Sequence, residues 1–288
     1  MVTEDLSSRI AKKNLPYCKV ISINRGSSED IYQTFMQHLT DLQDVYESLI
    51  DEDSKKTFRG YWLGRISNQM SEIVYTNSAH YLISGFIPKQ GAITFDAGAF
   101  DGGTATVFSE MGYKVYAFEM DIKNFERIKP IAEEKNFVIE NLSLGSYKHN
   151  MRYNAVGNSG GHWNDNGADI TQVTTIDAYA REHHLPSVDF IKLDTEGAEL
   201  EILKGAKTSI ARYKPILAIS AYHKLEDFWT LMNFIKSIRP DYEFAMRQGY
   251  ESPEEEPVNV SAQYADFLYS LGLEPQLRYF WECVLFAR

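Results

Sequence analysis

Basic residues are scarce in this sequence, in which 29 lysines and arginines stand against 40 aspartates and glutamates and the formal net charge is −11. A protein that binds a nucleic-acid backbone usually presents a basic face, so this balance argues against a nucleic-acid partner. It also argues against attachment to an anionic membrane surface. We therefore expect neither nucleic acid nor a membrane among the partners of the protein.

Cysteine is also rare, since Cys18 and Cys283 are the two cysteines of the 288-residue chain and lie near its opposite ends. They form neither a metal-binding spacing nor a disulfide framework, which favours a reducing compartment. Long apolar runs are missing as well, and the N-terminus lacks the apolar core of a signal peptide. These absences predict a soluble, cytoplasmic protein.

What the sequence does contain is a short apolar strand, residues 93–95, that runs into the glycine-rich turn DAGAFDGGT at residues 96–104. A helix is predicted to follow the turn, and a second strand, residues 114–118, ends at Glu119. This order is typical of the βαβ unit that opens a nucleotide-binding fold, although other α/β folds also have glycine turns. Glycines let the backbone approach a ligand, and the acid accepts hydrogen bonds from ribose hydroxyls.

The charge of the turn indicates which nucleotide binds. Asp96 and Asp101 would repel the pyrophosphate of a dinucleotide, which normally lies on such a turn and on the helix N-terminus. S-adenosylmethionine has no phosphate and carries an ammonium and a sulfonium group, so the acidic turn favours it. A nucleotide-dependent oxidoreductase shares the βαβ opening and remains the alternative.

Two regions are predicted from the distribution of apolar residues. Residues 1–90 are expected to form a helical extension, either packed into the core or placed as a cap over a ligand site, with one helix starting at Ser28 and another near Ser54. Residues 91–288 alternate strands and helices, which predicts a mainly parallel sheet with an insertion near residues 249–278. A flexible loop is predicted at residues 154–168. The seven predicted strands lie near 92–97, 114–119, 137–142, 188–194, 215–221, 242–247 and 281–287.

A second group of polar residues follows two later strands. Asp194 and Glu196 come directly after the strand that ends at Leu193, and Tyr222 and His223 follow the next strand. Ligands of open α/β sheets bind at the carboxyl ends of strands, so these side chains are expected near Asp96 and Glu119. Glu199 is interpreted instead as an acid that stabilises the start of a helix.

These motifs together resemble the FkbM family of S-adenosylmethionine-dependent methyltransferases. The resemblance is carried by DAGAFDGGT (96–104), AFEM (117–120), TTIDAY (174–179), DFIKLDTEGAELEILKGA (189–206), KPILAISAYHK (214–224) and the segment LIDEDSKK (49–56). It implies a Rossmann-like class I methyltransferase fold of the α/β class, with a seven-stranded, mostly parallel sheet and helices on both faces. It also implies O-methylation of a sugar, a glycan or a secondary metabolite. Met120 departs from the family, which often has proline at that position.

The expected chemistry is methyl transfer to a hydroxyl group of a small-molecule or glycan acceptor. Histidine exchanges protons near neutral pH, so His223 is the expected base, oriented or assisted by Asp194 or Glu196. Those carboxylates are also suited to a divalent cation, which is the less favoured alternative. Tyr222 and Trp163 are expected to contact the acceptor.

The predicted cofactor-binding residues are Asp96, Gly98, Ala99, Gly102, Thr104, Glu119, Met120, Asn141, Ser143 and Asp194. A non-catalytic binding module on the same scaffold would need no proton-handling residues.

Overall fold

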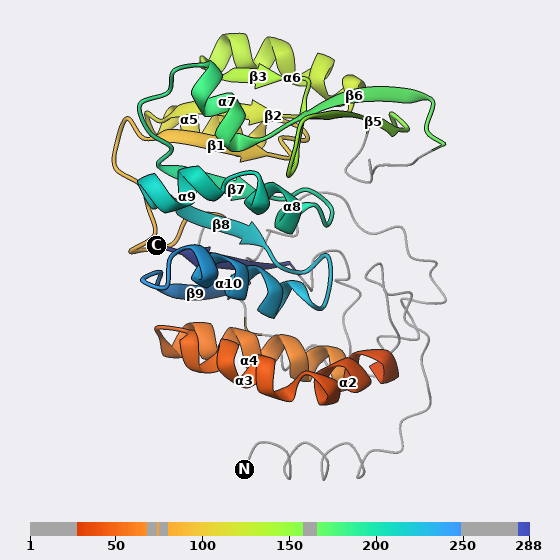
Figure 1. Ribbon diagram of the computed structural model, residues 1–288, viewed down its shortest axis with the longest axis vertical. Helices are drawn as coiled ribbons and strands as arrows, with labels where there is room; N and C mark the ends of the chain where they lie inside the picture. Colours follow the sequence, from red (N-terminus) through yellow and green to blue (C-terminus); the bar gives the residue numbers. More distant parts are fainter. Residues whose placement is uncertain (1–27, 68–73, 75–79, 158–165, 249–281) are drawn as a thin grey trace, which may run out of the picture.

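A seven-stranded sheet forms the centre of the protein (Figure 1). The computed structural model describes residues 28–67, 74, 80–157, 166–248 and 282–288. The strands of the sheet, in spatial order, are β3 (Val138–Glu140), β2 (Lys114–Phe118), β1 (Ile93–Ala97), β7 (Phe190–Leu193), β8 (Ile216–Ser220), β10 (Cys283–Ala287) and β9 (Phe244–Gln248). All seven were predicted from the sequence.

Neighbouring strands from β3 to β8 are parallel, whereas β10 runs antiparallel to both β8 and β9. Every residue of β1, β7 and β10 is buried, because helices cover both faces of the sheet. The predicted α/β class and the mostly parallel sheet are therefore confirmed.

Helices pack on the two faces of the sheet. One face carries α5 (Gly103–Glu110) and α6 (Ile122–Lys135). The other carries α7 (Ile176–Glu182), α8 (Glu199–Lys204), α9 (Lys207–Tyr213) and α10 (Asp227–Ile238), which lie side by side in Figure 1. Side chains along β8 alternate between the two cores, since Leu217 and Ile219 lie in one apolar cluster and Ala218 lies in the other.

Helices α2 (Ser28–Gln37), α3 (Leu39–Ser48) and α4 (Glu52–Ser67) precede the sheet in the chain. The sequence predicted one helix where α2 and α3 stand, but the helix is interrupted at His38. Helix α3 packs against α10, and α4 packs against β9. Leu49 forms an isolated parallel bridge with Phe244, so this region covers the β9 edge of the sheet. The proposed domain boundary near residue 90 stays a prediction.

A second, three-stranded sheet was not predicted. It consists of β4 (Ser143–Leu144), β6 (Asp169–Thr174) and β5 (His149–Tyr153), in that order. The predicted loop at 154–168 lies partly outside the described residues, which omit 158–165 and therefore Trp163, and the insertion near 249–278 lies wholly outside them. No helix in the described part of the chain has the length and apolar character needed to cross a bilayer.

Candidate functional site

The turn after β1 has an unusual backbone. Gly98 (φ 78°) and Gly102 (φ 82°) are in the left-handed region, and so is Phe100 between them (φ 50°). The N–H groups of Gly98 and Ala99 both donate to the carbonyl of Phe118 at the end of β2. A Cβ atom on Gly98 would lie 1.8 Å from the backbone oxygen of Asp194. Glycine is therefore required because the ends of β1 and β7 touch, whereas the sequence suggested that it allows a ligand to approach.

Asp96 forms a buried ion pair that the sequence did not indicate. Lys192 Nζ lies 2.9 Å from Asp96 Oδ1 and donates hydrogen bonds to the carbonyls of Gly98 (2.7 Å) and Ala97 (3.3 Å). Burial opposes the charged ammonium, but the carboxylates of Asp96 and Asp194 outweigh it and raise the pKa of Lys192. Lys192 therefore neutralises Asp96, and the turn repels a pyrophosphate less than its sequence indicated.

Glu119 lies buried at the end of β2, beside the same turn. One carboxylate oxygen accepts from the N–H of Phe100 (2.9 Å) and the other accepts from the N–H of Asp121 (2.8 Å). Burial raises the pKa of the Glu119 carboxyl. Asn141 Nδ2 donates to the carbonyls of Glu119 (2.9 Å) and Met120 (3.1 Å). The turn after β2 and the segment after β3 are thus fixed against each other.

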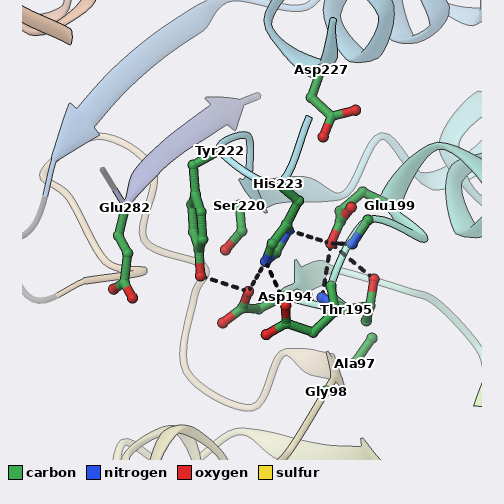
Figure 2. Close-up of polar contacts among 12 residues, drawn as sticks. Ala97, Gly98, Asp194, Thr195, Glu199, Ser220, Tyr222, His223, Asp227 and Glu282 are labelled. Atoms are coloured by element: carbon green, nitrogen blue, oxygen red, sulfur yellow. Dashed lines mark hydrogen bonds and ion pairs between the residues drawn. The ribbon is translucent and has the colours of Figure 1, made fainter. Parts of the chain in front are cut away.

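Asp194 is the centre of a polar cluster at the ends of β7 and β8 (Figure 2). Its carboxylate accepts hydrogen bonds from the hydroxyls of Tyr81 (2.8 Å) and Tyr222 (3.3 Å). Burial would raise the pKa of this carboxyl, but Lys192 and His223 outweigh burial and lower it. Asp194 is therefore a charged acceptor at neutral pH. The backbone of Asp194 contacts the glycine turn, and its side chain binds the two tyrosines.

His223 is surrounded by carboxylates, and its side chain is only 6% exposed. Nδ1 lies 3.0 Å from Glu199 Oε1, and Nε2 lies 3.4 Å from Asp194 Oδ1 and 3.8 Å from Glu196 Oε2. Burial would lower the pKa of the imidazole, but these three acids outweigh it and raise the pKa of His223 to about 9. The sequence had suggested a pKa near neutrality. In this arrangement His223 is an imidazolium at pH 7.

Glu199 does more than stabilise the start of a helix, the role that its position in the sequence indicates. Its side chain is 1% exposed, and Oε1 accepts hydrogen bonds from the N–H and the hydroxyl of Thr195. The turn that it closes contains Glu196 (φ 55°) and Gly197 (φ 98°), two successive residues in the left-handed region. Glu199 therefore stabilises the backbone that carries Asp194 and Glu196.

Comparison with known proteins agrees with this architecture. Residues 96–251 match the model of the methyltransferase FkbM domain, which is more than half of the chain. The chain belongs to the FkbM methyltransferase family. No curated protein matches the sequence.

Solved structures extend the comparison of the FkbM-family chain. A methyltransferase FkbM from Methylobacillus flagellatus KT superposes with a TM-score of 0.70 at 22% identity, over 93% of this chain. The chain spans 63% of the length of that protein. An rRNA methylase from Streptococcus thermophilus (TM-score 0.38, 11% identity, 70% of this chain and 87% of the other) is less similar. So is a precorrin-6y C5,15-methyltransferase from Geobacter metallireducens GS-15 (TM-score 0.38, 11% identity, 69% and 80%). The first of these comparisons shows the same fold over most of the chain.

The structure of this FkbM-family chain brings most of the predicted site residues to one edge of the sheet. Asp96 lies in β1, and Gly98, Ala99 and Gly102 lie in the turn after it, close in the chain to Thr104 at the start of α5. Ser143 lies in β4 of the small sheet. Asp194, Glu196, Tyr222 and His223 lie at the ends of β7 and β8. Among the described residues, no three His, Cys, Asp or Glu side chains are arranged as metal ligands.

Three residues of the site were not found from the sequence. Tyr81 precedes β1 in a segment that was assigned to the helical extension, and no local pattern marks its contact with Asp194, 113 positions away. Lys192 could have been found from the sequence, because a single lysine inside a buried apolar strand requires a charged partner. Ser220 ends β8 and lies 3.4 Å from the Tyr81 hydroxyl.

Proposed function

We propose that the protein is an S-adenosylmethionine-dependent methyltransferase of the EC 2.1.1 class that methylates a hydroxyl oxygen of a sugar, a glycan or a secondary metabolite. The observation that supports this most is the contact between Gly98 and the backbone of Asp194. It makes the glycine turn, beside Glu119, continuous with the cluster around His223. A nucleoside site and a proton-transfer site would therefore share one wall.

The chemistry of the turn fits this cofactor. Glu119 already orients its carboxylate through two backbone N–H groups, and its remaining lone pairs are suited to the two hydroxyls of a ribose. The carboxylate of Asp194, which stays charged at neutral pH beside this turn, would suit the ammonium group of the cofactor. Bound S-adenosylmethionine would supply a methyl group on a sulfonium, whose carbon–sulfur electron pair stays on sulfur when the methyl leaves.

The side chains at the ends of β7 and β8 would bind the acceptor and remove its hydroxyl proton. Tyr222 lies against His223 with ring centroids 4.2 Å apart, and its hydroxyl is fixed by Asp194. The neutral imidazole of His223 would accept the hydroxyl proton at Nε2 as the acceptor oxygen forms its bond to the methyl carbon. Since the pKa of His223 is raised to about 9, transfer is expected to speed up as the pH rises toward that value.

Calorimetry with S-adenosylhomocysteine, NAD and ATP in parallel tests the cofactor. We expect S-adenosylhomocysteine to bind in the micromolar range or tighter and NAD to bind far more weakly. Binding of NAD in preference to S-adenosylhomocysteine would support the oxidoreductase alternative and contradict the proposal. Because Lys192 neutralises Asp96, the charge of the turn does not by itself exclude NAD, and this comparison decides between the two cofactors.

An acceptor screen tests the reaction. Sugars, sugar nucleotides and polyketide alcohols are incubated with methyl-labelled S-adenosylmethionine, with and without a chelator, and the products are identified by mass spectrometry. We expect a product that is methylated at oxygen and heavier than its acceptor by one labelled methyl group less one hydrogen. Tight cofactor binding without transfer to any acceptor class would favour a non-catalytic binding module.

A further inference from the structure

A single buried oxygen atom, Oε1 of Glu199, connects the two loops that carry the proposed catalytic groups. It accepts hydrogen bonds from the N–H of Thr195 (2.8 Å) and of Gly197 (3.3 Å) in the turn after β7. The same atom lies 3.0 Å from Nδ1 of His223 in the loop after β8. Figure 2 shows the Glu199 side chain between His223 and Thr195.

We propose that Glu199 is a positioning residue, which holds the imidazole of His223 and the turn of residues 194–197 in one arrangement suited to methyl transfer. The catalytic part of this inference rests on the proposed function. The structural part, the hold of Glu199 on His223, does not depend on it.

The turn needs such a partner because its backbone is strained. Glu196 and Gly197 have φ values of 55° and 98°, and a non-glycine residue in this region persists only where its surroundings fix it. The Glu199 carboxylate gathers two N–H groups and one hydroxyl of this turn. Lys224 Nζ donates to the carbonyl of Gly197 and fixes the turn from the other side.

The position of Glu199 also selects which nitrogen of His223 serves as the base. With Nδ1 beside Glu199, a neutral imidazole retains its proton on Nδ1 and presents the lone pair of Nε2. Nε2 points toward Glu196 and toward Asp194, whose backbone touches the end of β1. During transfer, the acceptor hydroxyl would lose its proton to Nε2 while its oxygen gains the methyl carbon.

Several charged groups surround the imidazole. Asp194 and Glu196 approach it from the β7 turn and Glu199 from α8. Asp227, at the start of α10, interacts electrostatically with His223 and with Lys224. The Glu199 contact, at 3.0 Å, is shorter than those of Asp194 (3.4 Å) and Glu196 (3.8 Å). Removing the charge of Glu199 should therefore change the protonation of His223 more than removing either of the others.

Nuclear magnetic resonance tests the hold directly and needs no substrate. The seven histidines are labelled and titrated, and the His223 signal is assigned by its absence in His223→Gln. We expect His223 to titrate near pH 9 in the wild type. In Glu199→Gln the pKa of His223 should fall by about 1–3 units, because the nearest carboxylate has lost its charge.

Glu201→Gln is the matched control, because Glu201 lies on the same helix with its side chain 51% exposed. It should leave the pKa of His223 unchanged. An unshifted His223 pKa in folded Glu199→Gln would overturn the proposal. If that variant does not fold, the wild-type titration decides, because a His223 pKa near 6.5 would show that Glu199 has no hold on the ring.

The pH dependence of transfer gives the catalytic readout. In Glu199→Gln the inflection of the pH–rate curve should move to lower pH together with the His223 pKa. More of the imidazole is then neutral at pH 7, so the rate at pH 7 should fall less than the rate at high pH. A rate that drops uniformly at all pH values would indicate a structural role alone. Failure of the cofactor-binding test would refute the proposed function and leave the titration result intact.

Discussion

Gly91 and Gly98 make it possible to distinguish two costs of adding a side chain, the strain of a positive φ and the clash of the Cβ atom with its surroundings. Gly91 and Gly98 both have φ of 78°, but a Cβ on Gly91 meets nothing within 4 Å, whereas one on Gly98 meets the Asp194 carbonyl. Gly91→Ala should cost about 1 kcal/mol from backbone strain alone. Gly98→Ala should cost clearly more, because the ends of β1 and β7 must also separate. Chemical denaturation measures both; equal costs would show that the close contact is absent.

Glu119 provides the residue-level test of the nucleoside site. Glu119→Gln keeps an oxygen and removes the charge, so binding of S-adenosylhomocysteine should weaken by about 1.5–3 kcal/mol in calorimetry. Glu126→Gln, on an exposed position of the next helix, should have no effect. Unchanged affinity in Glu119→Gln would place the ribose elsewhere.

His223 is the residue on which the proposed chemistry depends. His223→Ala should slow transfer by about 10²-fold or more while cofactor affinity stays within a few-fold. In the wild type the rate should rise with pH toward about 9, because only the deprotonated imidazole accepts a proton. His184→Ala, at an exposed histidine, is the control. A wild-type rate in His223→Ala would assign this histidine a structural role.

At the scale of elements, the start of α10 contains a buried acid. Asp227 is 3% exposed and accepts the N–H of Lys224 (3.0 Å). Burial, together with the charge of Glu199, raises the pKa of Asp227 from 3.8 to about 7. The folded protein therefore binds this proton more tightly than the unfolded chain does, and the stabilisation is lost as the pH rises from about 4 through 7.

Asp227→Asn removes this titration and keeps the hydrogen-bond acceptor. The variant should gain stability relative to the wild type as the pH rises, reaching on the order of 1–4 kcal/mol at pH 8. Urea unfolding at pH 5 and pH 8 measures the difference, with Glu226→Gln at the neighbouring exposed position as control. A pH-independent difference between the variant and the wild type would contradict the raised pKa.

The strands of the large sheet were predictable because each is a short apolar run bounded by turn residues. The small sheet was not, since the strand His149–Tyr153 reads as a polar segment and only Tyr153 in it is buried. The break at His38 was missed for a different reason. The apolar spacing continues across it from α2 to α3, and periodicity alone does not detect a local interruption.

The candidate site was predictable where residues follow strands directly, as Asp194 and His223 do. Parallel strands bring their carboxyl ends to one edge, so sequence position implies proximity. Tyr81 reaches Asp194 only through the tertiary fold, and the buried role of Glu199 depends on the imidazole opposite. The protonation state of His223 cannot be read from the sequence either, because its pKa is raised by three acids of the segment after β7 that only the fold brings to the imidazole.

At the scale of the whole molecule, the N-terminal helices and the sheet share one core. Trp62 in α4 is 2% exposed and packs against Phe58 and against Phe228 of α10, with ring centroids 6.5 and 5.5 Å away. Trp62→Ala should therefore destabilise the protein by about 3–5 kcal/mol in a single unfolding transition. Tyr147→Ala, at a 63% exposed ring, should have little effect. Two separate transitions would show that the helices fold independently of the sheet.

The position of β10 in the sheet has a consequence for biosynthesis. This strand is the last of the described strands to leave the ribosome, yet it lies between β8 and β9. Until residues 283–287 emerge, β8 keeps an open edge and β9 has no partner on the sheet. Helix α4 is synthesised earlier and packs on β9, so its contact with the sheet also forms only after β9 has joined the sheet. Until then the nascent chain exposes the open edge of β8 and the unpaired strand β9, a state in which contact with a neighbouring chain competes with completion of the fold.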